Sequence, residues 1–330
     1  MALVGELFLL VIGIVLLIKG SDLFVDSGSA IGKVLKISEI LLGITIVAFG
    51  TSLPEFIVAI TSAQGNSNEI ALGNILGTNI FNTCVILSII ALIRPVKFKR
   101  DTVRKDMYMS VVTSLVLCFL MADKLLTGAE ANVISRADGL ILLVMFGIFM
   151  YYSLYSYADY WKERKEKTGE IKLKLKDIDS LTVNILKMIL GIILVFLGAK
   201  VTVNAVEKTA VMLKLSETFI SILVIAVGTS LPEIFTSIAA IKKGKHDIAV
   251  GNLIGSNMFN ILFVLGTAAV ISPIALQMDT LIIDAFTFLA VMVMLLLHAR
   301  AGKDHVISKV EGGSLLAIYL TYIIYVVIRG

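Results

Sequence analysis

Cysteine, histidine and proline are scarce in this sequence, and their shortage narrows the class of protein. Only 2 cysteines, 3 histidines and 4 prolines occur in 330 residues. Cys84 and Cys118 lie inside apolar segments without the spacing of metal ligands, so we interpret both as buried, inert thiols. The sequence has no P-loop or other nucleotide-binding motif, and no soluble domain to hold one. It therefore does not predict an enzyme or a nucleotide-driven pump.

Charged residues are also few, and long apolar runs take their place. Charged side chains make up 16% of the chain and hydrophobic ones 58%, with a mean hydropathy of +0.95. Runs of about 20 apolar residues, long enough to cross a bilayer, recur along the sequence. Leu3–Ile18 lacks the basic region and the cleavage site of a signal peptide, so we interpret it as a membrane helix. The sequence predicts an all-α integral membrane protein, and the net charge of +4 gives no reason to expect nucleic acid as a partner.

We expect ten membrane-spanning helices, divided five and five by one long polar stretch. Trp161–Ser180 is that stretch, and its length and charge favour a linker or a short amphipathic surface helix. The predicted spans lie at about residues 3–33, 38–64, 69–93, 106–123, 137–160, 183–210, 216–242, 247–271, 278–298 and 312–328.

One polar motif occurs twice in the chain. GTSLPE followed by GNILGTNIFN lies in Gly50–Asn82, and GTSLPE followed by GNLIGSNMFN lies in Gly228–Asn260. Every matched pair, including Glu55 with Glu233, is 178 positions apart with no gap. A polar motif that is duplicated inside apolar sequence predicts one site built from two halves.

The number of spans in each copy decides the symmetry. Because five is odd, the second copy enters the membrane from the side where the first copy ended. We therefore predict two inverted-topology repeats of five helices, at residues 1–160 and 181–330, joined by a linker at 161–180. The matched motifs would then face each other across the membrane midplane.

Lysine and arginine are distributed unevenly between the two sides of the predicted membrane. The connections after the odd-numbered spans hold twenty-one of these residues, and the opposite side holds five. Connections rich in lysine and arginine stay in the cytoplasm. We expect a multi-pass protein of the cell membrane with both termini outside and the 161–180 segment cytoplasmic.

Spans 2 and 7 each carry a proline and a glutamate in mid-membrane. Pro54 and Pro232 each remove a helical hydrogen bond and clash with the carbonyl group four residues back, so both helices should bend or break. Backbone groups freed in this way persist in a membrane only where they line a cavity or bind something. Glu55 and Glu233 follow directly, and carboxylates at this depth are functional by default. Thr51 precedes Glu55 by four residues and shares its helix face.

Spans 3 and 8 add polar side chains at every fourth position. The stripe consists of Asn74, Thr78 and Asn82, repeated as Asn252, Ser256 and Asn260. Such residues often only bond neighbouring helices, but their duplication beside two glutamates favours a ligand role. Four glycines leave room for close helix approach: Gly73, Gly77, Gly251 and Gly255.

The pooled ligands are carboxylate, hydroxyl, amide and carbonyl oxygens. Such sites suit hard cations, and a flexible cage suits Ca²⁺ better than Mg²⁺, which loses its water reluctantly. For Asp22 and Asp26 in span 1 we favour a structural role, with a place on an ion path as the alternative.

The duplicated motifs resemble those of the calcium/cation antiporter superfamily, specifically its compact prokaryotic sodium/calcium exchangers, over essentially the whole chain. The resemblance implies an ion-binding core of spans 2, 3, 7 and 8, with long tilted spans 1 and 6 that slide across it. It also implies that Ca²⁺ is held by Thr51, Glu55, Thr229 and Glu233. The family's full set of ion-binding positions falls here on Ala48, Thr51, Ser52, Glu55, Thr78, Asn82, Ala226, Thr229, Ser230, Glu233, Ser256 and Asn260.

Position 260 departs from several relatives, including the potassium-dependent exchangers, which carry Asp there. Asn82 and Asn260 leave two acidic ligands, which argues against K⁺ co-transport. Proton-coupled calcium exchangers typically place an acidic residue in the GN motif, and its absence here favours Na⁺ coupling.

We therefore expect a secondary-active antiporter that exchanges Na⁺ for Ca²⁺ by alternating access, electrogenic and independent of K⁺. Exchange of H⁺, or of another divalent cation, is the alternative. A channel would need a continuous pore with weak binding at many sites, whereas the motifs predict a single pair of acidic half-sites. The expected partners are the two ions and the lipid bilayer, with no cofactor, and the chain should function as a monomer.

The charge distribution predicts where an impermeant thiol reagent reacts. A Thr168→Cys variant that lacks Cys84 and Cys118 should be labelled only after cells are permeabilised, because position 168 lies in the predicted cytoplasmic linker. Strong labelling of intact cells would contradict this orientation and the division into five plus five spans.

Overall fold

The computed structural model of the protein describes residues 2–64, 68–98, 102, 105–168, 175–212, 228–276, 280–301 and 305–329. Most of these residues are helical, as the apolar sequence predicts, and the strands among them are two or three residues long. The chain forms two compact units, Met1–Thr51 with Gly147–Asn252 and Ser52–Phe146 with Leu253–Gly330. Each unit contains segments of both sequence copies, so the units differ from the predicted repeats.

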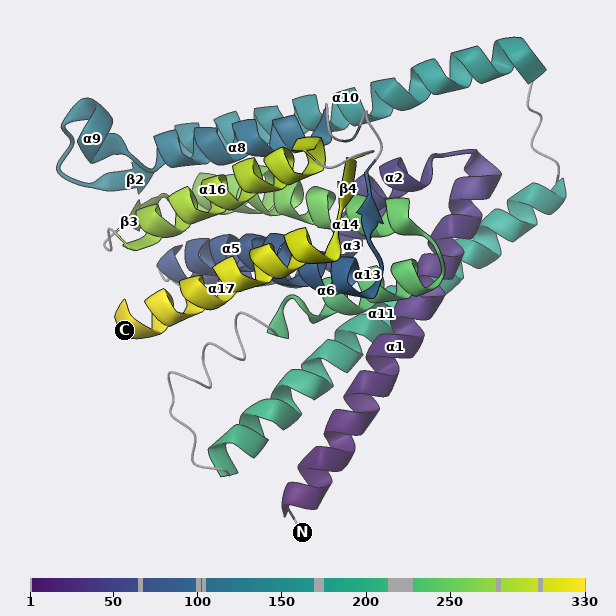
Figure 1. Ribbon diagram of the computed structural model, residues 1–330, viewed down its shortest axis with the longest axis horizontal. Coiled ribbons are helices and arrows are strands. Elements are labelled where there is room, and N and C mark those ends of the chain that lie inside the picture. Colours follow the sequence, from purple (N-terminus) through teal and green to yellow (C-terminus); the bar gives the residue numbers. More distant parts are fainter. Residues whose placement is uncertain are drawn as a thin grey trace. The chain divides into compact units, whose positions relative to one another are not determined.

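Long helices dominate the first unit (Figure 1). It contains part of α10 (Arg136–Thr168) and part of α14 (His246–Met258). Its complete elements are α1 (Ala2–Leu35), α2 (Glu39–Leu42), the π-helix η1 (Gly43–Val47), α3 (Ala48–Thr51), α11 (Leu175–Met212) and α13 (Leu231–Lys242).

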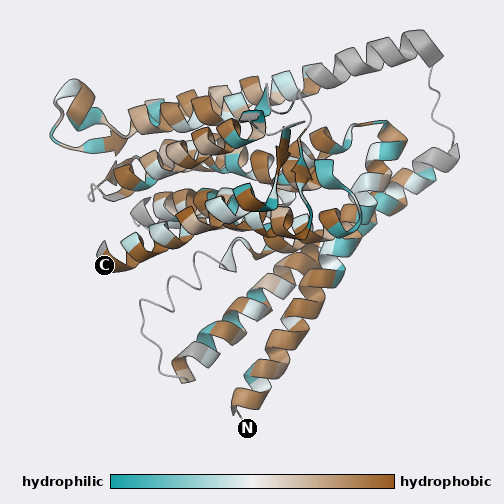
Figure 2. Cartoon of the chain, in the orientation of Figure 1, coloured by the Kyte–Doolittle hydropathy of each residue, from teal (hydrophilic) through white to brown (hydrophobic). Residues whose placement is uncertain are grey.

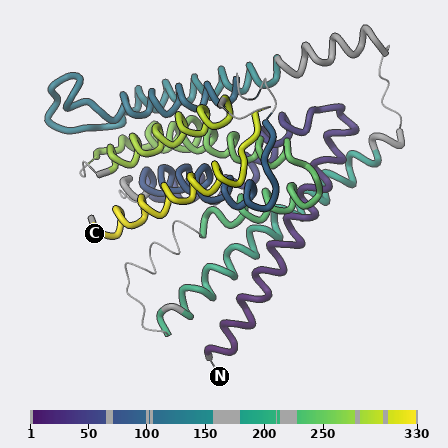
Figure 3. Tube along the Cα trace, in the orientation of Figure 1, coloured from purple at the N-terminus to yellow at the C-terminus, as the bar shows by residue number. Residues whose placement is uncertain are grey.

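Helices α1 and α11 lie side by side with glycines at their contact (Figure 3). A Cβ atom on Gly198 would lie 2.9 Å from the carbonyl oxygen of Gly13, and one on Gly20 would lie 2.9 Å from that of Gly191. The order of these contacts makes the helices antiparallel. Gly13 and Gly191 are 178 positions apart, as are Gly20 and Gly198, so each contact becomes the other when the two sequence copies are exchanged.

Helix α1 carries apolar side chains both at this contact and on its outer face. Leu17 is fully buried in a cluster with Val195 and Ala199, whereas Val4 and Phe8 are 70% and 66% exposed. Figure 2 shows α1 coloured as hydrophobic along most of its length. Large apolar side chains exposed along a helix of this length are typical of a surface that faces lipid.

The second unit is built from shorter helices and two small ladders. Strand β1 (Val96–Lys97) pairs antiparallel with β4 (Val306–Ile307), and β2 (Asn132–Ile134) with β3 (Ile274–Leu276), so both ladders join the two halves of the sequence. Its other complete elements are α4 (Leu53–Gln64), α5 (Asn68–Phe81), the π-helix η2 (Asn82–Ile86), α6 (Leu87–Ile93), α8 (Asp106–Leu120), α9 (Asp123–Thr127), the π-helix η4 (Phe259–Leu265), α15 (Gly266–Ile271), α16 (Thr280–Ala301) and α17 (Lys309–Arg329).

The predicted spans can be compared with these helices. Within the described residues, seven helices are long and apolar enough to cross a membrane, and the broken pair Glu39–Thr51 and Leu53–Gln64 makes an eighth if it counts as one span. Helix α8, in predicted span 4, is apolar but shorter, and the first part of predicted span 7 lies outside the described residues. The count of ten and the inverted repeats therefore stay predictions.

The predicted linker at 161–180 is partly helical. Helix α10 continues to Thr168 and α11 begins at Leu175, so both helices extend into this range.

The close approach of α1 and α11 predicts that Gly20→Ala destabilises the protein. An added Cβ would lie 2.8 Å from the backbone nitrogen of Val195, so the helices must separate at a cost of about 1–3 kcal/mol. Elsewhere in a helix the same change is stabilising by about 1 kcal/mol. Gly5→Ala in the same helix is the matched control, because no described atom lies within 4 Å of its Cβ position. Thermal unfolding in detergent should show a lower Tm for Gly20→Ala only, and equal Tm values would contradict the packing.

Candidate functional site

In both copies of the GTSLPE motif a helix begins at the Leu-Pro-Glu sequence. In the first copy α3 ends at Thr51 and α4 begins at Leu53, with a turn at Ser52 between them. In the second copy a turn at Thr229 and Ser230 precedes α13. Proline suits the first turn of a helix, where its missing N–H group has no partner to lose. The predicted break is therefore confirmed in the first copy. In the second copy the turn before α13 agrees with it, and the part of the span before Gly228 lies outside the described residues.

Each of these helices carries a glutamate in its first turn. Glu55 is the third residue of α4 and Glu233 the third residue of α13, and both side chains are fully buried. The N-terminus of a helix carries a partial positive charge from its aligned peptide dipoles, which stabilises a carboxylate there. The local sequence Leu-Pro-Glu thus builds a favourable position for a buried negative charge in each copy.

In the first unit, Thr51 and Asn252 bring the two motifs together. The Thr51 hydroxyl lies 3.0 Å from Asn252 Oδ1 and 3.3 Å from the carbonyl oxygen of Ala48, and it can donate to either. Asn252 Nδ2 in turn donates to Ser237 Oγ at 3.2 Å. All three polar side chains are buried, and Glu233 and Ser230 lie in the same unit. Asn252 therefore connects a predicted ligand of one copy to α13 of the other.

In the second unit, the predicted ligands from both copies are buried on helices that pack together. Helix α4 contacts α5 and η4, and the ring of Phe56 stacks on that of Phe263 at 5.4 Å. The predicted ligands of this unit are all 0% exposed: Ser52, Glu55, Thr78, Asn82, Ser256 and Asn260.

Four asparagines of this unit form a reciprocal set of hydrogen bonds. Asn82 Nδ2 donates to Asn257 Oδ1 at 3.3 Å, and Asn260 Nδ2 donates to Asn79 Oδ1 at 3.1 Å. Exchanging the two sequence copies turns one bond into the other, because Asn82 matches Asn260 and Asn79 matches Asn257 at the offset of 178 positions. The oxygens Asn82 Oδ1 and Asn260 Oδ1 are buried and accept no hydrogen bond from any described residue.

The π-helices η2 and η4 lie at these asparagines. Asn82 is the first residue of η2 and Asn260 the second residue of η4. Short π-helical segments inside α-helices are frequent at functional sites.

Asp22 and Asp26 of α1 form ion pairs with Lys243, which follows α13. Lys243 Nζ lies 3.2 Å from Asp22 Oδ1 and 2.6 Å from Asp26 Oδ2. Partial burial lowers the pKa of Lys243, but hydrogen bonds and attraction to both aspartates outweigh it and hold the pKa above its usual range. These contacts support the structural role that the sequence favours for both aspartates.

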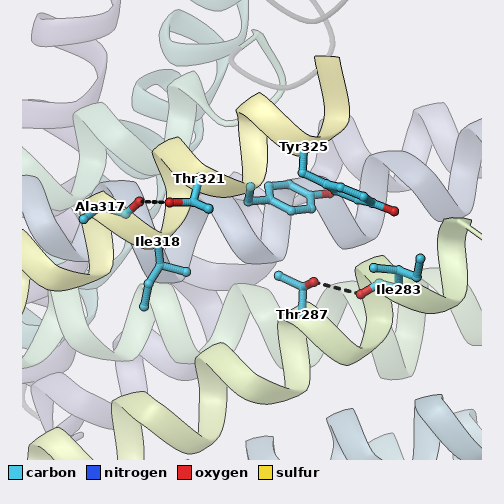
Figure 4. Close-up of a pocket in the computed structure, with 7 residues that line it drawn as sticks. Ile283, Thr287, Ala317, Ile318, Thr321 and Tyr325 are labelled. Atoms are coloured by element: carbon cyan, nitrogen blue, oxygen red, sulfur yellow. Dashed lines mark hydrogen bonds between the residues drawn. The ribbon is translucent and has the colours of Figure 1, made fainter. Parts of the chain in front are cut away.

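A groove between α16 and α17 has the wrong chemistry for a cation (Figure 4). It encloses about 420 Å³, and the hydroxyls of Thr287 and Thr321 donate to carbonyl groups of their own helices. No carboxylate is among the residues that line it: Ile283, Thr287, Ala317, Ile318, Thr321, Tyr322 and Tyr325.

The whole chain is similar to known cation exchangers. The family model described as sodium/calcium exchanger protein matches residues 5–155 and 183–328. The chain belongs to this family. Inner membrane protein YrbG of Escherichia coli (strain K12) is 32% identical over 266 residues, covering 80% of this chain and 79% of that protein. Sodium/calcium exchanger MaX1 of Methanosarcina acetivorans is 28% identical over 341 residues, covering 96% and 97%.

A solved structure of the sodium-calcium exchanger NCX_Mj, soaked with Na⁺ and Sr²⁺, has a TM-score of 0.81 to this chain. The two are 25% identical, and the match covers 97% of this chain and 98% of the other. The resemblance seen in the duplicated motifs is thus confirmed. The protein is a multi-pass membrane member of an exchanger family, which consists of secondary transporters and not enzymes.

Some buried polar residues that bond to the predicted ligands were not predicted. Asn79 and Asn257 lie inside the duplicated motif, and their identity in both copies was the available signal. Ser237 and Thr83 are not identical between the copies, so the duplication does not indicate them. Of the predicted ligands, Ala226 lies outside the described residues, and Thr229 is half-buried.

The predicted close approach at the motif glycines is confirmed for one of them and wrong for another. A Cβ atom on Gly251 would lie 2.6 Å from the carbonyl oxygen of Ile40, whereas one on Gly77 would meet no described atom within 4 Å. A small residue leaves space, but the neighbouring helix decides whether the space is filled.

The bond between Thr51 and Asn252 predicts that Thr51→Val destabilises the protein. The change removes a buried donor to Asn252 Oδ1, and an unsatisfied buried acceptor costs about 1–3 kcal/mol. Thr61→Val is the control, because the exposed Thr61 hydroxyl donates only to carbonyl groups of its own helix. Unfolding measurements on both variants should show a lower stability for Thr51→Val alone. Equal stability would mean that the bond contributes nothing.

Proposed function

We propose that this protein exchanges Na⁺ for Ca²⁺ across the cell membrane by alternating access. The observation that carries the proposal is the burial of Glu55 and Glu233, each in the first turn of a helix, in a membrane protein of the exchanger family. Two carboxylates that are kept from water in this way need cations to balance them.

Charge balance gives the exchange mechanism. One Ca²⁺ neutralises Glu55 and Glu233, and two Na⁺ do the same. A third Na⁺ held by hydroxyl and carbonyl oxygens would make the exchange electrogenic. An empty carrier keeps uncompensated charge at membrane depth, which costs several kcal/mol and slows the switch between its two orientations. Transport in one direction therefore requires transport in the other.

The neutral ligands support Na⁺ coupling without K⁺. The amide oxygens of Asn82 and Asn260 are buried and accept no hydrogen bond from the described residues, which suits them to a cation. These amides add no negative charge, so the proposed site carries only the two negative charges of Glu55 and Glu233. We propose the ligand set that the family resemblance implies: Ala48, Thr51, Ser52, Glu55, Thr78, Asn82, Ala226, Thr229, Ser230, Glu233, Ser256 and Asn260.

The proposal includes ten helices in two inverted repeats, both termini outside, and function as a monomer without a cofactor. The reciprocal glycine contacts of α1 with α11 and the reciprocal asparagine bonds support two equivalent halves. The charge bias of the connections supports the orientation.

Ion flux in proteoliposomes tests the function. Vesicles loaded with Na⁺ should take up ⁴⁵Ca²⁺ along a saturating curve, and uptake should stop when internal Na⁺ is replaced by choline. A positive internal potential, set with a K⁺ gradient and valinomycin, should speed uptake, whereas K⁺ without valinomycin should not. Uptake driven by a pH gradient in the absence of Na⁺ would replace the proposal with H⁺/Ca²⁺ exchange. Uptake that needs no counter-ion would indicate a channel.

Glu55→Gln and Glu233→Gln should each abolish Na⁺-driven Ca²⁺ uptake, because a divalent ion in a site of low dielectric needs both charges. Glu130→Gln changes an exposed glutamate in the same way and should transport at the normal rate. Gel filtration of the three variants shows whether they are folded. Near-normal exchange by either buried-site variant would falsify the two-carboxylate mechanism.

A further inference from the structure

The side chains of Asn79 and Asn257 have a fixed orientation, and two backbone carbonyls set it. Asn79 Nδ2 lies 3.4 Å from the carbonyl oxygen of Asn257. A carbonyl oxygen only accepts hydrogen bonds, so the nitrogen end of the Asn79 amide must face it. The oxygen end of Asn79 is then left to accept from Asn260 Nδ2 at 3.1 Å.

The Asn257 side chain is fixed through Thr83. The Thr83 hydroxyl donates to the carbonyl oxygen of Asn79 at 2.9 Å, so it presents its lone pairs to Asn257. Asn257 Nδ2 donates to Thr83 Oγ1 at 2.8 Å, which leaves Asn257 Oδ1 to accept from Asn82 Nδ2 at 3.3 Å. The orientation of Asn79 therefore follows from a carbonyl oxygen that can only accept, and that of Asn257 from a hydroxyl whose single hydrogen is donated to the Asn79 carbonyl oxygen.

These two sets of hydrogen bonds fix the orientation of the Asn82 and Asn260 side chains. Asn82 and Asn260 are fully buried, and each uses its nitrogen in the network. The side-chain oxygen of each is therefore not used in the network, and it accepts no hydrogen bond from any described residue. A buried amide oxygen with no donor is costly unless a ligand takes it up.

We infer that Asn79 and Asn257 are positioning residues that turn the side-chain oxygens of Asn260 and Asn82, respectively, to the transported cation. The inference rests on the proposed function, since it assumes that a cation is the missing partner. An asparagine amide has an oxygen end that binds a cation and a nitrogen end that repels it. In a free side chain both orientations are accessible, and the network selects the binding one before the ion arrives.

Single substitutions test the positioning. Asn79→Leu and Asn257→Leu keep the shape of the side chain but remove the acceptor, so each should raise the Kd for Ca²⁺ about tenfold or more. Asn132→Leu is the matched control in the same unit, because buried Asn132 accepts from the backbone of Lys124 outside the network. It should lower the Tm and leave the Kd unchanged. Calorimetric titration of Ca²⁺ into purified protein, with ion-free melting curves, measures both.

Replacing Asn82 or Asn260 by aspartate distinguishes a positioning role from a general loss of structure. A carboxylate presents an oxygen in either orientation, so a ligand aspartate does not need to be turned. In an Asn82→Asp background, Asn257→Leu should change the Kd by about twofold at most, whereas Asn79→Leu should still change it about tenfold. In an Asn260→Asp background the two results should be reversed. Equal effects of both leucines in both backgrounds would overturn the positioning role.

Other outcomes are also decisive. Thr83→Val removes the acceptor that orients Asn257 and conserves volume, and it replaces the leucine variant if that one fails to fold. It too should raise the Kd, and a Kd equal to that of the parent would overturn the inference for Asn257. If the parent protein neither binds nor transports Ca²⁺, the proposed function fails. If the parent binds Ca²⁺ and both leucine variants bind it equally well, only the positioning fails.

Discussion

A carboxylate that is buried at membrane depth has to be balanced by something other than water, and the rest of this structure depends on that constraint. The protein carries two such groups, Glu55 and Glu233, and treats them alike. In each copy a helix begins at Leu-Pro-Glu, so a helix N-terminus lies at the carboxylate. The peptide dipoles supply a partial positive charge. Under the proposed function, a transported cation would supply the remainder.

The other buried polar side chains of the duplicated motifs add no charge. Asn252 links Thr51 to Ser237 in one unit, and four asparagines bond reciprocally in the other. These bonds restrict the amides, because each buried member has few alternative partners. If the amide oxygens are the cation ligands that we propose, they are oriented in advance, and the binding energy of the ion is not spent on ordering them.

The sequence was sufficient to predict the membrane class, the break at Pro54 and the burial of both glutamates inside the protein, because these follow from hydropathy, from proline geometry and from the duplicated motif. It was not sufficient for the orientation of the amides. The roles of Asn79 and Asn257 depend on the carbonyl and hydroxyl groups that face them, and those contacts exist only in the folded protein. The π-helices were also missed, since no residue pattern in the motif distinguishes an i+5 turn from an i+4 turn. Gly77 shows the same limit, because its open space depends on a neighbouring helix.

The π-helices also follow the duplication of the motif. A π turn holds about one residue more than an α turn, because its hydrogen bonds join residues five apart and not four. Here η2 and η4 occupy equivalent places in the two copies, at Asn82–Ile86 and Phe259–Leu265. The copies align without a gap through this region, as far as Pro95 and Pro273. An insertion made after duplication would have left a gap in one copy. The π turn is therefore a property of the repeated motif itself and not of one copy.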